Sequence, residues 1–192
     1  TKIDGSNVLE KLGLEKGKYI VVSAHREENI DIKNHFEILS ESLNAVAEKY
    51  QVPVIFSTHP RTKNRIEKNG IQFHPLIKNV PPLGFFDYVN LQKNSYIVLS
   101  DSGTISEESA MMNFPAVSIR TSTERPEAID WGTIVLGGIS KDSMLNSIEI
   151  ARGLALDDES QLPVEYTIKN TASRVIRAIQ SYTPSVNTVI WD

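Results

Sequence analysis

The feature of the sequence that most constrains its fold is a repeated alternation of short apolar runs with longer amphipathic segments. Residues 18–24 (KYIVVSA) form a run rich in β-branched residues, which predicts a strand buried on both faces. In residues 31–50 the apolar positions recur at steps of three and four, which predicts a helix with Asp31 as its N-cap. Such an alternation is typical of a parallel sheet covered by helices on both faces.

The same alternation continues through the rest of the chain, with no internal repeat or linker. We therefore expect one doubly wound, Rossmann-like α/β domain over residues 1–192, in which ligands bind beyond the carboxyl ends of the strands. Strands are predicted at 53–57, 71–77, 96–99, 115–119 and 133–136, and helical segments at 60–69, 84–92, 104–112, 125–131, 140–156 and 167–182.

Composition and charge narrow the class of protein. The net charge is −4 and Lys and Arg are scattered, which argues against a general nucleic-acid or membrane-surface binder. Cysteine is absent and the four histidines lack metal-ligand spacing, so we expect neither a metal nor a cofactor. No apolar run approaches the roughly 20 residues that span a bilayer, and no signal peptide opens the chain, so we expect a cytoplasmic protein. Because the chain begins with Thr1, we expect a fragment that lacks a partner domain.

Polar and ionisable residues follow four of the predicted strands. They lie in residues 25–29, 57–61, 100–104 and 120–126. Because the carboxyl ends of parallel strands meet at one edge of a sheet, we expect these residues to line a common binding edge.

Residues 101–104 (Asp-Ser-Gly-Thr) stand where a strand gives way to a helix. The free N–H groups of the first helical turn and the helix dipole form an anion site there. Gly103 allows a phosphate to approach the backbone, and the hydroxyls of Ser102 and Thr104 can add hydrogen bonds. A structural alternative is a capping box between Thr104 and Glu107.

Glu108 lies at the margin of the inward face of the same predicted helix, whereas Glu107 points away from it. A carboxylate in that place can accept hydrogen bonds from two vicinal hydroxyls, as in a ribose. A partly exposed helix glutamate is the alternative interpretation.

Further positions carry side chains suited to binding or catalysis. His25 has the side chain whose ordinary pKa suits acid–base work near neutral pH. Arg26 can grip a phosphate or a carboxylate in a bidentate manner, and Arg125 can reach a phosphate or the base-side pocket. A ring among Phe85, Phe86 and Tyr88 can stack on a nucleobase. The alternatives are a solvated charged loop for His25 and Arg26, an ordinary surface residue for Arg125 and core positions for the aromatic rings.

These segments resemble, in order and over nearly the whole chain, the C-terminal half of bacterial non-hydrolysing UDP-N-acetylglucosamine 2-epimerases. The resemblance rests on residues 25–29 (HREEN), 82–83 (PL), 100–108 (SDSGTISEE) and 123–128 (TERPEA). It implies the C-terminal domain of a two-domain GT-B fold, with the active site between the two halves.

The resemblance also implies a role for each candidate residue. UDP would lie against this half, and the reaction would invert C2 of the sugar by anti elimination and re-addition of UDP, without a cofactor. The carboxylates that move the C2 proton would belong to the missing N-terminal half, and the full-length enzyme would be a homodimer. The implied site residues are His25 as a catalytic group, Ser102, Gly103, Thr104 and Arg26 at the diphosphate, Glu108 at the ribose, Leu83 and Tyr88 at the uracil, and Arg125 lining the pocket.

Departures from the family pattern leave alternatives open. Thr104 and Ala24 stand where many members have glycine, and residues 57–61 differ near a histidine that serves an allosteric site in common members. Together with the tail at 182–191, these features favour a second substrate, UDP-2-acetamido-2,6-dideoxy-L-talose, whose epimerisation gives UDP-N-acetyl-L-fucosamine for capsule or O-antigen polysaccharides. A GT-B glycosyltransferase and a non-catalytic nucleotide-sugar sensor are further alternatives.

Overall fold

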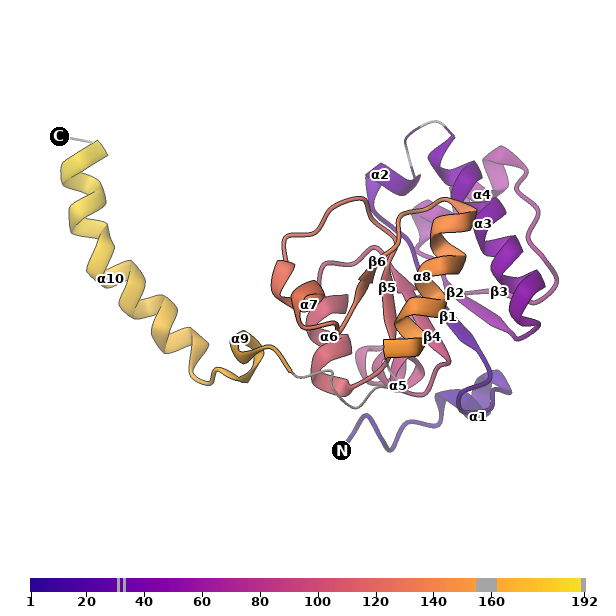
Figure 1. Cartoon of the computed structure of the whole chain (residues 1–192), viewed down its shortest axis with the longest axis horizontal. Coiled ribbons are helices and arrows are strands. Elements are labelled where there is room, and N and C mark those ends of the chain that lie inside the picture. Colours follow the sequence, from indigo (N-terminus) through magenta and orange to yellow (C-terminus); the bar gives the residue numbers. More distant parts are fainter. Residues whose placement is uncertain (31, 33, 155–161, 191–192) are drawn as a thin grey trace. The chain divides into compact units, whose positions relative to one another are not determined.

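A computed structural model describes residues 1–30, 32, 34–154 and 162–190, except for the side chain of Arg61. Its strands form one sheet in the order β3-β2-β1-β4-β5-β6, and all neighbouring strands are parallel (Figure 1). This order reverses between β1 and β4, which is the arrangement of a Rossmann-like sheet, so the predicted fold class is confirmed. The strands are β1 (Ile20–Ser23), β2 (Val54–Ser57), β3 (Ile77–Val80), β4 (Ile97–Ser100), β5 (Ala116–Ser118) and β6 (Val135–Leu136).

Helices connect the strands and cover both faces of the sheet. The helices of the described residues are α1 (Val8–Leu12), α2 (Glu27–Ile30), α3 (His35–Tyr50), α4 (Pro60–Asn69), α5 (Phe85–Lys93), α6 (Ile105–Met112), α7 (Pro126–Asp130), α8 (Lys141–Leu154), α9 (Val164–Thr167) and α10 (Thr171–Ile190).

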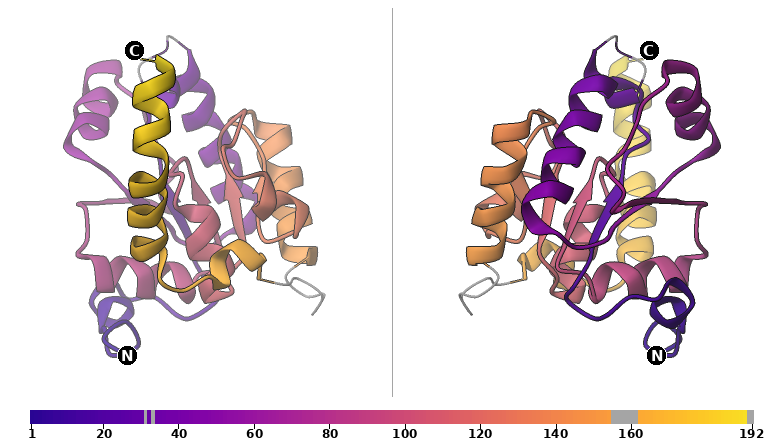
Figure 2. Two further views of the ribbon diagram at one scale, coloured as in Figure 1. Left: turned by 90° about the vertical axis from the view of Figure 1, so that its left-hand side faces the viewer. Right: turned by 90° about the vertical axis from the view of Figure 1, so that its right-hand side faces the viewer.

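The core lies between the sheet and helices α3 and α8, which are side by side on one face (Figures 1 and 2). Alternate strand residues point to this face and pack on Phe36, Leu39 and Met144. The intervening residues, such as Val21 and Val98, are also buried and face the opposite side. The strands are therefore buried on both faces, as their unbroken apolar runs predicted.

Two of the predicted boundaries before β4 are wrong. The helix expected from residue 31 begins at His35, and a separate short helix, α2, precedes it. The Asp31 N-cap lies outside the described residues. The strand expected at 71–77 starts only at Ile77, because Pro75 has no N–H group for a sheet ladder and the Ile77 N–H donates to the His74 carbonyl in a turn (2.8 Å).

The chain divides into two compact units, Thr1–Leu162 and Pro163–Asp192, and the sheet lies in the first. In the second unit, α10 extends past the predicted end at residue 182, and α9 was not predicted. None of the helices in the described part of the chain is both long and apolar enough to cross a membrane. The single domain over residues 1–192 stays a prediction.

A row of serines crosses the sheet at the carboxyl ends of its central strands. Ser57, Ser23, Ser100 and Ser118 are register partners from β2 through β1 and β4 to β5. These small side chains form the end of the sheet from which the predicted site residues project.

Candidate functional site

The predicted binding edge forms where the loops after β1 and β4 meet, at the point where the strand order reverses. The loop after β1 carries His25 and Arg26, and the loop after β4 carries residues 101–104 before α6 begins. In a doubly wound sheet this is the position at which ligands bind. The first turn of α4 lies against the same loop, since the Thr62 hydroxyl donates to the Ala24 carbonyl (3.2 Å).

The buried carboxylate of Asp101 holds the loop after β1 in place. It accepts the backbone N–H groups of His25 (2.9 Å) and Arg26 (2.9 Å) and the side-chain amide of Asn29 (3.1 Å). His25 Nδ1 lies 3.2 Å from the same carboxylate, while about half of the imidazole is exposed. A ring held through Nδ1 keeps Nε2 free for acid–base work on a ligand.

Two guanidinium groups converge on Gly103. A Cβ atom built on this glycine would lie 3.7 Å from Arg26 Nη2 and 3.7 Å from Arg125 Nη1. Arg125 also donates from Nε to Glu107 Oε1 (2.5 Å), which fixes the direction of its side chain. The absence of a side chain at Gly103 therefore leaves a backbone surface flanked by two positive charges, which suits a phosphate.

A chain of side-chain hydrogen bonds runs along the start of α6. The hydroxyls of Ser102 and Thr104 are 3.1 Å apart, and Thr104 donates to Glu108 Oε1 (2.8 Å). The other oxygen of Glu108 accepts from Gln92 Nε2 on α5 (2.9 Å). Thr104 makes no side-chain cap, and Glu107 pairs with Arg125 instead, so the capping-box alternative is wrong.

Arg120, which follows β5, forms a second charged cluster behind the loops. Its buried guanidinium donates two hydrogen bonds to Glu124 (2.8 Å each) and one to Glu28 (3.2 Å). These hydrogen bonds from Arg120 lower the pKa of Glu124 to about 2, and they raise that of the guanidinium. The cluster ties α2 to the loop between β5 and α7.

Tyr88 lies at the inner end of the predicted uracil segment. Its hydroxyl forms a hydrogen bond with that of Ser23, and burial followed by the nearby charges of Glu108 and Asp101 raises its pKa to about 12. The phenol thus keeps its proton and lies beside the β1 loop. Leu83 is half-buried, and next to it Phe85 and Phe86 are exposed, with ring centroids 5.6 Å apart.

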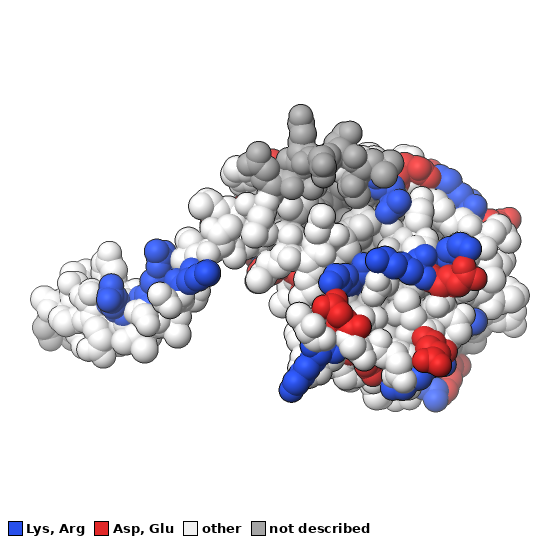
Figure 3. Space-filling view, turned by 90° about the horizontal axis from the view of Figure 1, so that it is seen from below, with Lys and Arg blue, Asp and Glu red and all other residues white. Residues whose placement is uncertain are grey.

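Charges elsewhere on the first unit are mostly balanced locally. Lys93 pairs with Asp4 (2.8 Å) and Lys49 with Glu149 (2.8 Å). On the face of the first unit that Figure 3 shows, basic and acidic side chains likewise lie next to one another. At Gly103 two guanidinium groups converge on one point, although Arg125 also pairs with Glu107 through its Nε.

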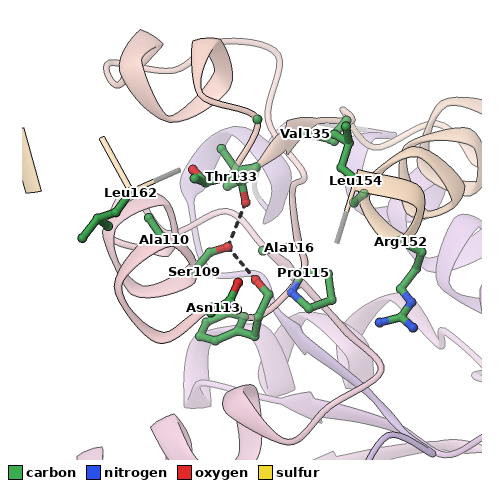
Figure 4. A pocket seen from close by; sticks show the side chains of 14 residues that line it. Ser109, Ala110, Asn113, Pro115, Ala116, Thr133, Val135, Arg152, Leu154 and Leu162 are labelled. Atoms are coloured by element: carbon green, nitrogen blue, oxygen red, sulfur yellow. Dashed lines mark hydrogen bonds between the residues drawn. The ribbon is translucent and has the colours of Figure 1, made fainter. Parts of the chain in front are cut away.

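One cavity lies at the opposite end of the sheet, and another lies beside α4 at the carboxyl ends of β2 and β3. One, of about 240 Å³, is at the amino ends of β5 and β6, where Ser109 donates to the Phe114 and Thr133 carbonyls (Figure 4). The other, of about 570 Å³, lies between α4 and the end of β3 and includes Thr58 and Asn79. Neither is lined by the predicted site residues.

The structure brings His25, Arg26, Gly103 and Arg125 to one edge, and a continuous set of contacts joins Ser102, Thr104 and Glu108. Sequence reasoning gave no role to Asp101 or Gln92. An aspartate directly after a buried strand was the available signal for the first. For Gln92 the signal was weaker, a polar residue beside Leu91 on an apolar helix.

Comparisons with known proteins identify the family of this chain. A family described as UDP-N-acetylglucosamine 2-epimerase matches residues 1–180. The UDP-N-acetylglucosamine 2-epimerase of Methanococcus maripaludis is 37% identical over 139 residues, which cover 69% of this chain and 37% of that relative.

Solved structures show the same similarity. The UDP-N-acetylglucosamine 2-epimerase from Rickettsia bellii has a TM-score of 0.80 and 34% identity, covering 99% of this chain and 51% of that one. The UDP-GlcNAc 2-epimerase of Methanocaldococcus jannaschii, in complex with UDP-GlcNAc and UDP, has a TM-score of 0.77 and 27% identity, covering 93% of this chain and 50% of that one. The chain thus spans about half the length of these solved relatives, and it belongs to the UDP-N-acetylglucosamine 2-epimerase family.

Proposed function

We propose that this chain is the UDP-binding half of a UDP-N-acetylglucosamine 2-epimerase of GT-B type, which interconverts UDP-N-acetylglucosamine and UDP-N-acetylmannosamine. Family membership supports the reaction, and the length of the relatives supports a second half that completes the active site. A homodimer and a role in polysaccharide biosynthesis belong to the same proposal.

The observation that carries the proposal is the pair of guanidinium groups at Gly103. Arg26 and Arg125 each reach within 3.7 Å of the position that a side chain would occupy there. Two guanidinium groups that converge on one point stabilise an anion of high charge there, and Arg125 does so while its Nε pairs with Glu107. The diphosphate of a UDP-sugar is such an anion, and the Ser102 hydroxyl lies on the neighbouring residue.

The same geometry fits elimination of UDP. As the bond between the sugar and the diphosphate breaks, negative charge develops on the leaving oxygen, and fixed cations stabilise that charge without reorganisation. They also keep UDP bound for re-addition. His25, oriented by Asp101, is the acid–base group of this half.

The remainder of the nucleotide would extend from Gly103 toward α5. Glu108 would accept the ribose hydroxyls, and Tyr88 and Leu83 would contact the uracil. The hydrogen bond between Thr104 and Glu108 connects the diphosphate and ribose ends of this surface.

A titration of the 192-residue chain with UDP tests the site. Because a hydrogen bond to a charged group contributes roughly 1.5–3 kcal/mol, Glu108→Ala and Arg26→Ala should each weaken UDP binding at least about tenfold. Calorimetry or NMR measures the dissociation constants. Lys78→Ala, on the exposed edge strand β3, is the control for loss of one positive charge and should leave affinity unchanged. Equal affinity for the wild type and both site variants would reject the assignment.

The reaction is tested with a protein of the relatives' length that carries this chain. In deuterated water, epimerisation of UDP-N-acetylglucosamine should place deuterium at C2, because the returning proton comes from solvent. Mass spectrometry and NMR detect the label, and a glycosyltransferase would leave C2 unlabelled. A parallel incubation with UDP-2-acetamido-2,6-dideoxy-L-talose tests the alternative substrate. The 192-residue chain alone should produce no label, since the carboxylates expected to move the proton belong to the other half.

A further inference from the structure

The buried amide of Gln92 contacts the candidate site through one hydrogen bond. Gln92 lies on α5 with 1% of its surface exposed, and Nε2 donates to Glu108 Oε2 at 2.9 Å. The other oxygen of Glu108 accepts from the Thr104 hydroxyl at 2.8 Å. An ionised carboxylate has about two acceptor positions on each oxygen. Each oxygen of Glu108 therefore has one protein donor and one position left for a ligand.

Packing alone does not account for an amide at position 92. Its carbonyl oxygen Oε1 is buried and has no hydrogen-bond partner among the described residues. An unpaired buried carbonyl is unfavourable, and an apolar side chain of similar size would avoid it. Rotation of the amide would place two acceptors against each other at Glu108, so the partner fixes the orientation. What an amide supplies here is the N–H group that faces the carboxylate.

We propose that Gln92 is a positioning residue that fixes the carboxylate of Glu108 for the 2′- and 3′-hydroxyls of the ribose. This inference rests on the proposed function. The terminal torsion of a glutamate is broad, so an unsupported carboxylate samples many orientations. Donors from Gln92 on one side and Thr104 on the other restrict that torsion before the nucleotide arrives. Binding then requires less ordering of the site.

The test compares two nucleotides on the same chain. Gln92→Met removes the amide and keeps an unbranched side chain that favours helix and packs in cores. Affinity for UDP should fall roughly tenfold, in keeping with one hydrogen bond to a charged group. Affinity for 2′,3′-dideoxyuridine diphosphate, which lacks both hydroxyls, should be unchanged. A purely structural role would lower both affinities alike.

Asn90→Leu is the matched control. Asn90 is a buried amide on the same helix, but its Nδ2 donates to the Ile3 carbonyl (2.7 Å), away from Glu108. Its loss should not change the ratio of the two affinities. A second measurement needs no variant: the side-chain amide signals of Gln92 in the wild type should shift on addition of UDP and stay in place with the dideoxy nucleotide.

The outcomes separate this inference from the function on which it rests. One outcome is that Gln92→Met leaves the ratio of the affinities for UDP and the dideoxy nucleotide unchanged, while Glu108→Gln makes the two affinities equal. The positioning role is then wrong, and the ribose role of Glu108 stands. If the wild-type chain binds both nucleotides equally, the ribose role fails and the positioning role fails with it. Gln92 amide signals that move equally with both nucleotides also overturn the inference.

Discussion

The carboxylate of Asp101 links the end of β4 to the loop after β1 through donors from three residues, His25, Arg26 and Asn29. Asn29 in turn donates to the Ile119 carbonyl beyond β5 (3.1 Å). Asp101 and Asn29 together therefore join the carboxyl ends of three adjacent strands. A buried carboxylate is stable in this position because several donors replace the water that it loses.

Asp101→Asn tests this role with a change of almost no volume. The substituted amide presents an N–H₂ group to a site occupied only by donors, so the variant should be less stable by roughly 2–3 kcal/mol. Urea unfolding measures the difference, and faster hydrogen exchange is expected at the amides of His25 and Arg26. Asp130→Asn, at the exposed end of α7, should change stability by less than about 0.5 kcal/mol. A fully stable Asp101→Asn protein would contradict the role.

Single residues of the site were predictable where they stand next to a strand end. Arg26, Gly103 and Arg125 follow β1, β4 and β5, so a parallel sheet places them together. The contact of Gln92 with Glu108 was not predictable, because it depends on how α5 and α6 pack. The apolar pattern within each helix does not predict the distance between side chains on two different helices.

The loop between β5 and α7 is an element whose shape depends on the ion pair between the buried guanidinium of Arg120 and the exposed carboxylate of Glu124. Arg120 is 4% exposed and grips Glu124 with two hydrogen bonds. Arg125, which reaches Gly103, follows directly in this loop. The ion pair therefore helps to hold Arg125, which we propose to contact the diphosphate, in its position.

The pKa of Glu124 predicts a pH dependence of stability. Hydrogen bonds from Arg120 lower this pKa from 4.5 to about 2, so the folded state favours the ionised form. The stabilisation is complete above pH 4.5 and disappears as the pH falls through about 2. Unfolding free energies of the wild type and Glu124→Gln should thus differ near neutrality and converge toward pH 2.

The control for this experiment is Glu41→Gln, which removes one negative charge from the exposed surface of α3. It accounts for the change in net charge. A difference between the wild type and Glu124→Gln that stays constant from pH 6 to pH 2 would show that the ion pair does not carry the effect.

The sequence predicted which segments are helices and strands better than it predicted where they begin and end. The apolar runs of β1, β2 and β4 identified buried strands, since no other short element requires such runs. The segment before α3 was misjudged because periodicity does not show where the chain turns: Asn34 adopts a φ of 76° just before the helix. Pro75 was placed inside the strand predicted at 71–77, whereas the observed strand, β3, begins after it at Ile77.

At the scale of the whole molecule, the order of the strands follows from chirality. The chain moves one way from β1 to β3 and the other way from β4 to β6. Right-handed crossovers place the helices of these two halves on opposite faces, and the loops separate where the direction changes. Alternating strands and helices predicted this architecture, but α9 and the full length of α10 did not follow from it.

The row of serines at the ends of the central strands has a steric consequence. Ser57, Ser23, Ser100 and Ser118 are in register across four strands, so the sheet ends in side chains of one uniform, small size. Register partners point to the same face of a sheet, so these serines lie together on the face opposite α3 and α8. Ser100 and Ser118 are buried, and the Ser100 hydroxyl accepts the Ser102 N–H (3.1 Å). A larger residue at Ser100 would therefore press on the loop that carries Ser102 and Gly103, so the small size of this strand end also sets the shape of the loop.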